Sequence, residues 1–535
     1  MKAPSLLRSM ASFSAMTFVS RLLGLAREIV IATIFGANAT TDAFWVAFRI
    51  PNFLRRLFAE GSFSVAFVPV LTEFKETRTH AELKELVART SGTLGAALLI
   101  VTALGVVGAA WITRGFAPGS IDEPVKFALT TDLLRIMFPY LLFVSLTALA
   151  GGVLNSFHRF ALPALTPAIM NLCMIAGAVW LAPHLGAPIM ALGWAILAAG
   201  ILQLLVQLPA LRAIGLLAWP RWGWGHTGVR RVLTLMLPTL FGSSIAQVNL
   251  LLDTLIASFL ITGSQTWLAQ TDRLLEFPLG IFGVALGTVI LPSLARHHVV
   301  TDRSGFSRAL DWGLRTALLI SLPAMLALVL LAKPLVATLF QHGHFTAHDA
   351  DMAALSLSAL SVGLPAFALV KVVAPAFYAR QDTRTPVRAG VIAMIANMVM
   401  NVFFVTLLFL LWRGPAHPGD DWLAAIARVP GLHMGLALSS ALASYLNLSQ
   451  LWRALAREGI YVREPGWGRH LFRLGCGCAA MVAALLLGLA FWHDWSAWPT
   501  SVRVLRLGTL IVAGGASFVA VLFAAGFRVR DLRAT

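Results

Sequence analysis

The chain has 535 residues, of which 58% are hydrophobic and only 12% are charged. A water-soluble globular domain carries about 25% charged residues, so this composition excludes a soluble protein and indicates an α-helical membrane protein. The formal net charge of +17 comes from basic residues interleaved with apolar runs, which does not indicate a nucleic-acid partner.

Apolar windows close to membrane-spanning length recur along the whole chain. A helix needs about 20 predominantly apolar residues to cross a bilayer. Clear examples are Leu94–Ile112, Ile169–Ala182, Thr316–Ala332, Gly390–Leu411 and Cys478–Trp492. The windows predict an all-α polytopic protein with about fourteen transmembrane helices, centred near residues 23, 57, 100, 142, 173, 199, 246, 281, 322, 365, 400, 442, 482 and 516.

The first window is interrupted by Arg21, Arg27 and Glu28. A secretory signal peptide has an uninterrupted apolar region, so we expect this segment to be a retained first helix. About 25 of the 41 Lys and Arg residues fall at the span ends on the side of the N-terminus, against about 7 at the opposite ends. With an even number of spans, this bias predicts that both termini are cytoplasmic.

The five arginines of the first two windows are the most informative residues: Arg21, Arg27, Arg49, Arg55 and Arg56. An arginine near the bilayer centre costs about 2.5–3.5 kcal/mol, so these side chains must face a protein interior, a watery cavity or the interface. Arg49 and Arg56 remain open as interface residues.

Pro51 lies within the second window. Because proline removes a helical hydrogen bond and clashes with the preceding turn, it predicts a bend or break near Phe48–Asn52. Broken helices persist in membranes where they line a cavity. Guanidinium groups bind phosphates through paired hydrogen bonds, so the arginines favour a diphosphate over a carboxylate as the anion bound there.

A faint internal repeat relates Pro139–Asn171 to Pro365–Asn397, which have equal lengths. Each segment carries an apolar span, a short basic turn and a second apolar span that ends in Asn. Repeated transporter folds place their binding site between the repeats. We therefore expect two six-helix lobes around a central cavity, residues 1–220 and 221–465, followed by two extra C-terminal helices in residues 466–535.

The second half holds two further groups of charges in apolar surroundings. Arg273 and Glu276 are three residues apart and can pair on one helix face. Asp253 stands alone in an apolar run, and a buried carboxylate is costly unless it is protonated or binds a cation. We predict a coupling-ion site there, for sodium or a proton, with neighbours from the set Asn397, Asn401 and Asp382.

Enzyme signatures are absent from the sequence, which contains no Walker loop, no HExxH and no GxSxG motif. We therefore predict a transporter with no cofactor other than a coupling ion.

Four stretches carry a family pattern: SRLLGLARE (Ser20–Glu28), the long motif Gly36–Leu71, DRLLEFPLGIFGVALGTVILPSL (Asp272–Leu294) and FYARQDTRTPV (Phe377–Val387). In these stretches the chain resembles the MurJ (MviN) lipid II flippases of bacteria. The resemblance implies the fold of the multidrug/oligosaccharidyl-lipid/polysaccharide exporter superfamily, with the last two helices forming a groove for the lipid tail.

The resemblance also implies a function in the bacterial inner membrane, the transfer of undecaprenyl-diphosphate-linked disaccharide-pentapeptide to the outer leaflet for peptidoglycan synthesis. The implied partners are lipid II, membrane lipids and peptidoglycan synthesis enzymes. The family's cavity arginines match Arg21, Arg27, Arg55 and Arg273, and its acidic residues match Asp42, Glu60 and Glu276. Glu28 stands where the family usually has Asp, and some members bind sodium through an Asp that Asp253 matches.

Two other functions are compatible with a polytopic membrane protein. A drug/cation antiporter of the same superfamily would need an acidic and aromatic cavity, which the arginines argue against. A non-transporting scaffold for cell-wall synthesis predicts that the charges inside the spans are dispensable.

Overall fold

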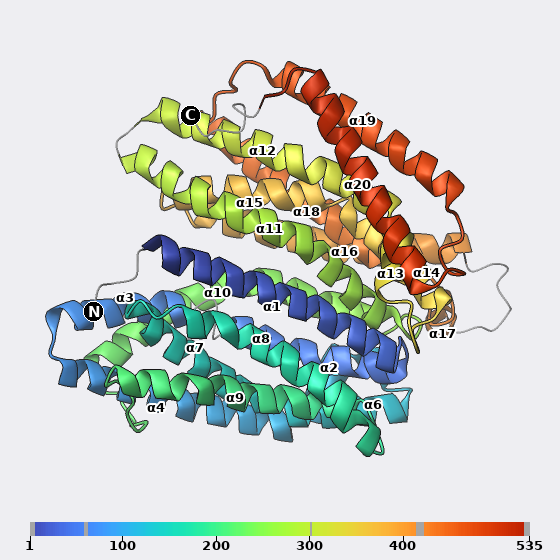
Figure 1. The fold of residues 1–535 in the computed structure, drawn as a ribbon. Coiled ribbons are helices and arrows are strands. Elements are labelled where there is room, and N and C mark those ends of the chain that lie inside the picture. Colours follow the sequence, from blue (N-terminus) through green and yellow to red (C-terminus); the bar gives the residue numbers. More distant parts are fainter. Residues whose placement is uncertain (1–5, 58–62, 300–301, 413–421, 529–535) are drawn as a thin grey trace. The chain divides into compact units, whose positions relative to one another are not determined.

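The computed structural model describes residues 6–57, 63–299, 302–412 and 422–528, and every regular element within them is helical (Figure 1). This confirms the predicted all-α class. The chain divides into two compact units, residues 1–265 and 266–535, and each is described by itself. The lobes predicted from the repeat, with their boundary after residue 220, remain a prediction.

The first unit is built of long helices joined by short connections. Its elements are α1 (Leu6–Phe35), α2 (Ala39–Arg55), α3 (Ser64–Thr77), α4 (His80–Val107), α5 (Ala109–Phe116), η2 (Pro118–Ser120), α6 (Pro124–Met137), α7 (Tyr140–Ser156), α8 (Ala161–Ala176), η3 (Gly177–Leu181), η4 (Ala182–His184), α9 (Met190–Ala213) and α10 (Thr227–Ala257). Helix α1 packs along α8, whereas α2 packs on α6 and α7. A buried apolar core joins α3, α4 and α7 through side chains that include Phe67, Leu86 and Val153.

The second unit repeats this style of packing. Its elements are α11 (Ser264–Val299, which begins in the first unit), α12 (Arg303–Leu330), α13 (Ala332–Leu339), α14 (Ala347–Ser361), α15 (Leu364–Tyr378), α16 (Arg384–Trp412), α17 (Trp422–Ile426), α18 (His433–Arg457), α19 (Trp467–Phe491) and α20 (Thr500–Ala524). Helix α15 packs on both α12 and α18, and α19 packs on α20 and α12. The main core includes Leu310, Val372 and Leu451.

Local sequence signals set several helix starts. Asn38, Thr79 and Thr346 are the N-cap residues of α2, α4 and α14, and each forms a reciprocal capping box with the residue three positions later. A capping box satisfies two backbone N–H groups that have no partner inside the helix. These three starts are therefore determined by the sequence on either side of the first turn.

Eight helical segments within the described residues are long and apolar enough to span a membrane, or nine if the pair α14–α15, bent by 40°, counts as one span. The other five predicted spans fall on α1, α2–α3, α10, α11 and α18, which carry charged or polar residues. Each of the fourteen predicted centres lies on a helix or at the turn inside a helix pair. The protein is a multi-pass membrane protein.

The predicted interruption at Pro51 is displaced. Helix α2 continues through Pro51 and ends at Arg55, so no break occurs at Phe48–Asn52. The helix instead widens into a π-type turn at Arg56 and Leu57, and residues 58–62 lie outside the described part. A proline can remain inside a helix where the neighbouring turns adjust to its missing hydrogen bond.

The two halves of the predicted repeat form the same order of helices. In each unit a pair of consecutive helices, α6–α7 or α14–α15, leads through a basic turn into a further helix, α8 or α16. Pro139 precedes α7 and Pro365 lies in the first turn of α15. The basic turns hold His158 and Gln381, the two non-glycine residues with positive φ in the described chain.

Candidate functional site

Arg27 is the most deeply buried of the predicted arginines, with 1% of its surface exposed. Its guanidinium pairs with the carboxylate of Glu28, which is equally buried. Its Nη1 also donates to Asn171 Oδ1 of α8 at 3.0 Å and lies 3.7 Å from Met174 Sδ. A buried charge is tolerated only where it is paired and hydrogen-bonded; Glu28 of the same helix supplies the ion pair and Asn171 of α8 supplies the hydrogen bond.

Asn171 also fixes α8 to the backbone of α1, since its Nδ2 donates to Ser20 O at 3.0 Å. Gly24 lies between these contacts, and a Cβ at Gly24 would be 3.5 Å from Asn171 Nδ2. Asn171 thus contacts α1 on both sides of Gly24, at Ser20 and at Arg27.

Arg21 lies on the same helix as Arg27 and is half-buried. Within the described residues it makes no hydrogen bond or ion pair, whereas the charge of Arg27 is balanced by Glu28. The two arginines of α1 therefore differ in their surroundings, because Arg27 is paired with Glu28 and Arg21 has no polar partner among the described residues.

The other two arginines near the end of the second predicted span have separate contacts. Arg55 bends back on its own helix, with Nε and Nη2 at 3.1 and 2.9 Å from Asn52 Oδ1. Arg56 Nη1 lies 3.5 Å from Gln247 Oε1 of α10. Both are half-buried.

Arg49 is not an interface residue, because only 6% of its surface is exposed. Its Nη1 donates to Thr254 Oγ1 at 2.6 Å and to Gln265 Oε1 at 3.1 Å. The Nε2 of Gln265 donates in turn to the carbonyl of Thr254 at 2.8 Å. Arg49 thus joins α2 to the end of α10 and the start of α11.

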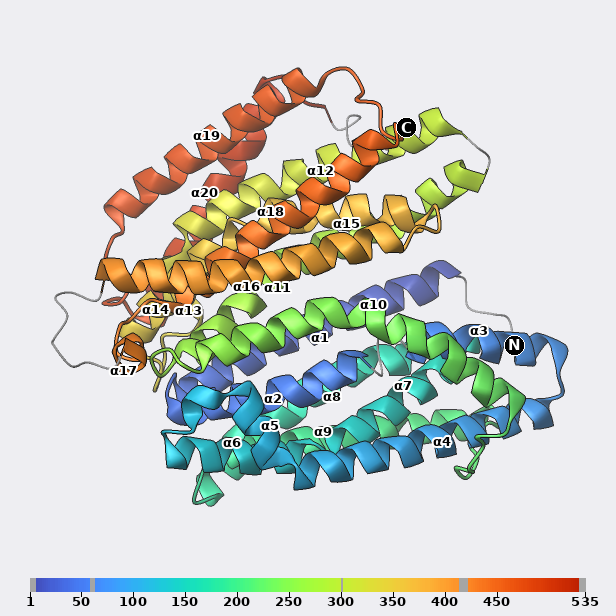
Figure 2. The ribbon, with the colours of Figure 1, turned by 180° about the vertical axis from the view of Figure 1, so that it is seen from behind.

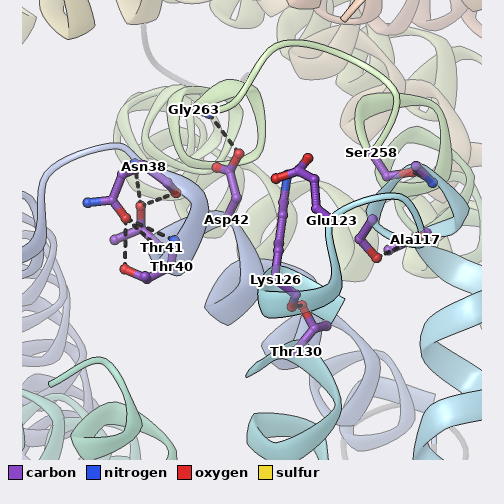
Figure 3. Close-up of polar contacts among 12 residues, drawn as sticks. Asn38, Thr40, Thr41, Asp42, Ala117, Glu123, Lys126, Thr130, Ser258 and Gly263 are labelled. Atoms are coloured by element: carbon purple, nitrogen blue, oxygen red, sulfur yellow. Dashed lines mark hydrogen bonds and ion pairs between the residues drawn. The ribbon is translucent and has the colours of Figure 1, made fainter. Parts of the chain in front are cut away.

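Asp42 lies in the first turn of α2, with 2% of its surface exposed. Its Oδ2 accepts the backbone N–H of Gly263 at 2.7 Å, just before α11 begins. Figure 3 shows the carboxylate pointing at this amide, away from the Asn38 cap. A carboxylate at a helix N-terminus satisfies a free N–H and interacts favourably with the helix dipole, so Asp42 holds the start of α11.

A second contact lies at this end of the first unit. The backbone N–H of Gly119 in η2 donates to Ser258 Oγ at 3.1 Å, and a Cβ at Gly119 would come within 2.1 Å of Ser258 O. Nearby, Lys126 Nζ lies 3.2 Å from Glu123 Oε1 (Figure 3). The end where α2 and α6 begin is therefore closed onto the end of α10 by short polar contacts.

In the second unit, Arg273 Nη1 and Glu276 Oε2 of α11 lie 2.9 Å apart, as their spacing predicts. Both side chains are well exposed, by 37% and 52%, so their pairing contributes little to stability. Asp253, on α10 of the first unit, is half-buried, with its Oδ2 3.4 Å from Asn249 Nδ2. Glu60 lies outside the described residues.

Three partners of the predicted arginines carry no recognisable signal in the sequence: Asn171, Thr254 and Gln265. Asn171 is a single polar residue in an apolar window, which the sequence marks only as the end of the repeat. Thr254 follows Asp253, and Gln265 lies just before the eighth predicted span. Their roles depend on helix packing between segments that are up to 216 residues apart.

Comparisons with known proteins identify the family of the chain. The model of the family "Lipid II flippase MurJ" matches residues 31–416. A probable lipid II flippase MurJ from Vibrio cholerae is 44% identical over 99% of this chain and 98% of its own length. A lipid II flippase MurJ from Burkholderia cenocepacia is 42% identical over 99% of both chains.

A solved structure titled "Lipid II flippase MurJ, inward closed conformation" has the same fold. Its TM-score is 0.75 at 24% identity, and the match covers 95% of this chain and 97% of the solved one. The identity to the two bacterial relatives extends over nearly the whole length of the chain, and the resemblance to the MurJ (MviN) lipid II flippases is confirmed. The chain belongs to the lipid II flippase MurJ family.

Proposed function

We propose that this protein moves lipid II from the cytoplasmic to the periplasmic leaflet of a bacterial inner membrane by alternating access. Membership of the family carries the choice of substrate, and it makes the protein a transporter in peptidoglycan synthesis and not an enzyme. The observation that carries the site is Arg27, a guanidinium held inside an apolar helix pair with its charge balanced by Glu28.

In this proposal Arg21, Arg27, Arg55 and Arg273 bind the diphosphate of the lipid. Arg21 has no competing partner within the described chain, and Arg55 and Arg273 are contacted by Asn52 and Glu276 of their own helices. A diphosphate offers several oxygens to the guanidinium forks and binds more strongly in a low-dielectric site. Glu28 and Glu276 keep two of these arginines oriented when no diphosphate is bound.

The roles of the remaining acidic residues, Asp42 and Glu60, are supported by different observations. The carboxylate of Asp42 is committed to the N–H of Gly263, so the structure supports a role in holding α11 and offers no support for direct contact with substrate. Glu60 is proposed from the family resemblance alone. The two C-terminal helices α19 and α20 pack on each other, and we propose that they form the groove for the lipid tail.

We propose Asp253 as the coupling-ion site, for sodium or a proton. No three His, Cys, Asp or Glu side chains converge on a metal site within the described residues. A sodium ion at Asp253 would therefore take most of its ligands from amide, hydroxyl and carbonyl oxygens, which hard cations accept. Asn249 already lies beside the carboxylate.

The proposed topology has both termini in the cytoplasm, which the distribution of Lys and Arg supports. Peptidoglycan synthesis enzymes are the proposed protein partners, because lipid II must be made before transport and consumed after it.

The diphosphate site is tested by replacing its arginines in cells depleted of the native flippase. We expect Arg27→Ala and Arg273→Ala, at verified expression, to lower the outer-leaflet fraction of lipid II by at least tenfold, since loss of a charged hydrogen bond costs about 1.5–3 kcal/mol. Arg308→Ala is the matched control, because Arg308 is exposed at the start of α12.

A normal lipid II distribution in cells that carry either variant would rule out the arginine site, because the charges inside the spans would then be dispensable. Export of cationic drugs with unchanged lipid II distribution would favour the antiporter instead.

The ion site is tested with Asp253→Asn, which keeps the shape of the side chain and removes its charge. We expect lipid II transport to lose its dependence on sodium or on pH, whichever ion the wild type uses, in reconstituted vesicles. An Asp253→Asn variant that responds to both ions as the wild type does would remove Asp253 from the mechanism.

A further inference from the structure

A groove in the second unit is distinct from all the residues considered above. Helix α15 packs on both α12 and α18, and Figure 2 shows these three helices close together in the second unit. The cavity between them has a volume of about 560 Å³ and is lined by Leu314, Leu318, Leu369, Tyr445, Leu448, Ser449, Trp452, Arg453 and Trp467. This volume falls in the range of about 300–1,000 Å³ that is usual for small-molecule sites.

The lining of the groove is arranged like the boundary of a membrane. Leucines from α12, α15 and α18 form its apolar part, and the rings of Tyr445, Trp452 and Trp467 lie among them. Aromatic rings of this kind concentrate at the level of lipid head groups. The groove lies toward the end of the unit where α12 begins and α18 ends, which we place in the cytoplasm.

One buried carboxylate, that of Asp311, fixes the Trp467 ring of the aromatic wall of the groove, which consists of Tyr445, Trp452 and Trp467. Asp311, 3% exposed, accepts from Trp467 Nε1 at 2.6 Å and from Tyr461 Oη at 2.5 Å. Arg315 Nε lies 2.6 Å from its second oxygen. Burial and the hydrogen bond to Asp311 raise the pKa of Tyr461, so the phenol stays a donor, and the Trp467 ring keeps its orientation without a ligand.

Two arginines near this wall, Arg453 and Arg463, have no hydrogen bond or ion pair within the described residues. Arg453 lines the groove, and Arg463 lies with Cζ 5.8 Å from the centre of the Trp467 ring. Both side chains are exposed. The groove therefore combines an apolar floor with the guanidinium group of Arg453 in its lining and that of Arg463 beside the Trp467 ring.

We propose that this groove is a binding site for an anionic phospholipid, which lays an acyl chain along the leucines and its phosphate against Arg453 and Arg463. An uncharged lipid would use the apolar floor but not the arginines. Each basic residue near an anionic head group contributes about 1 kcal/mol, which corresponds to about fivefold in affinity. Preorganisation of the Trp467 wall lowers the ordering cost of binding.

The test uses the full-length protein in nanodiscs of zwitterionic lipid that contain a trace of photo-crosslinking phosphatidylglycerol or phosphatidylcholine, with the reactive group on the acyl chain. We expect phosphatidylglycerol to label the α18 segment around Leu448 and Trp452 several-fold more than phosphatidylcholine does. Arg453→Gln and Arg463→Gln should each lower this labelling by about fivefold.

Arg388→Gln is the matched control, since Arg388 is exposed on α16 and has no polar partner in the described chain. It should leave the labelling unchanged. Leu448→Trp should block labelling by both lipids; if this variant unfolds at a lower temperature than the wild type, Leu448→Phe replaces it.

Equal labelling by the two lipids, or labelling insensitive to both arginine variants, would overturn the proposal. Competition by undecaprenyl diphosphate at lower concentration than by phosphatidylglycerol would also overturn it, because the groove would then belong to the transported lipid. Since binding is measured without transport, neither result depends on the proposed flippase activity.

Discussion

Arg27 and Glu28 form a buried ion pair, in which the charge of each residue depends on the other. Removing one member of a buried ion pair leaves a charge uncompensated and costs about 3–5 kcal/mol. Substitutions at these positions therefore affect folding as well as binding. The role of Arg27 is better tested through a neighbour that carries no charge.

Asn171 is that neighbour. We expect Asn171→Ala to lower lipid II transport several-fold, because Arg27 loses its Nη1 acceptor and α8 loses its bond to Ser20. The free energy of unfolding should fall by about 1–3 kcal/mol. Transport assays and thermal unfolding of the purified protein measure the two effects.

Asn155→Ala serves as the control for this prediction, since Asn155 is exposed at the end of α7. Should Asn171→Ala behave like this control in both measurements, Asn171 would not position Arg27.

At the scale of single residues, the sequence predicted which arginines lie in unusual positions. It did not predict which residues they contact. Arg27 stood out because an arginine in an apolar window is expensive wherever it faces lipid. Arg49 had the same signal, yet its partners Thr254 and Gln265 identify it as a structural residue. The distinction depends on helix packing, which the local pattern does not contain.

At the scale of elements, hydropathy predicted the positions of the spans, whereas the capping boxes that begin α2, α4 and α14 were recognised only in the structure. The interruption of the second span was predicted too early in the chain, because Pro51 remains inside α2. The internal repeat predicted two matching stretches, Pro139–Asn171 and Pro365–Asn397, and in the structure each begins with a proline at the start of a helix, α7 or α15, and continues into the next helix, α8 or α16.

The basic turn before α16 permits a prediction about pH. Asp382 Oδ1 accepts the backbone N–H groups of Arg384 and Thr385 at 3.0 and 3.1 Å. Burial raises the pKa of Asp382, but the hydrogen bonds from Thr385 and Arg384 outweigh this effect, and its pKa lies below the ordinary value. The carboxylate therefore stabilises the folded state when it is ionised.

The stabilisation by Asp382 should be complete above the ordinary pKa of about 3.9 and should disappear as the pH falls through its lowered pKa. Asp382→Ala should cost about 1 kcal/mol at neutral pH, and the gap to the wild type should close in acid. Thermal unfolding between pH 3 and pH 7 measures this gap. Asp494→Ala, which removes an exposed carboxylate in another connection, should show no such closure.

At the scale of the whole molecule, composition and the placement of Lys and Arg sufficed to predict a multi-pass helical membrane protein. The substrate class came from the family motifs, because an arginine cluster alone specifies an anion and nothing larger. The groove beside Trp467 had no signal in the sequence, because its lining residues come from four helices. The orientation of Trp467 depends on a hydrogen bond to a single aspartate, Asp311.

The contact of Gly119 with Ser258 also belongs to this scale. An alanine methyl at position 119 would lie 2.1 Å from the Ser258 carbonyl oxygen, which is backbone and cannot rotate away. We expect Gly119→Ala to force η2 away from the end of α10 and to speed amide hydrogen exchange at residues 255–260 by about tenfold or more. Gly115→Ala is the control, because a methyl there meets nothing within 4 Å; equal exchange in the two variants would refute the expectation.

The methyl group of Gly119→Ala would thus push η2 and the end of α10 apart by a defined steric clash. A cell that depends on this protein and carries Gly119→Ala should acquire second mutations that restore growth by making room near Ser258. The positions of those suppressors would map, by genetics alone, which residues set the separation between η2 and α10.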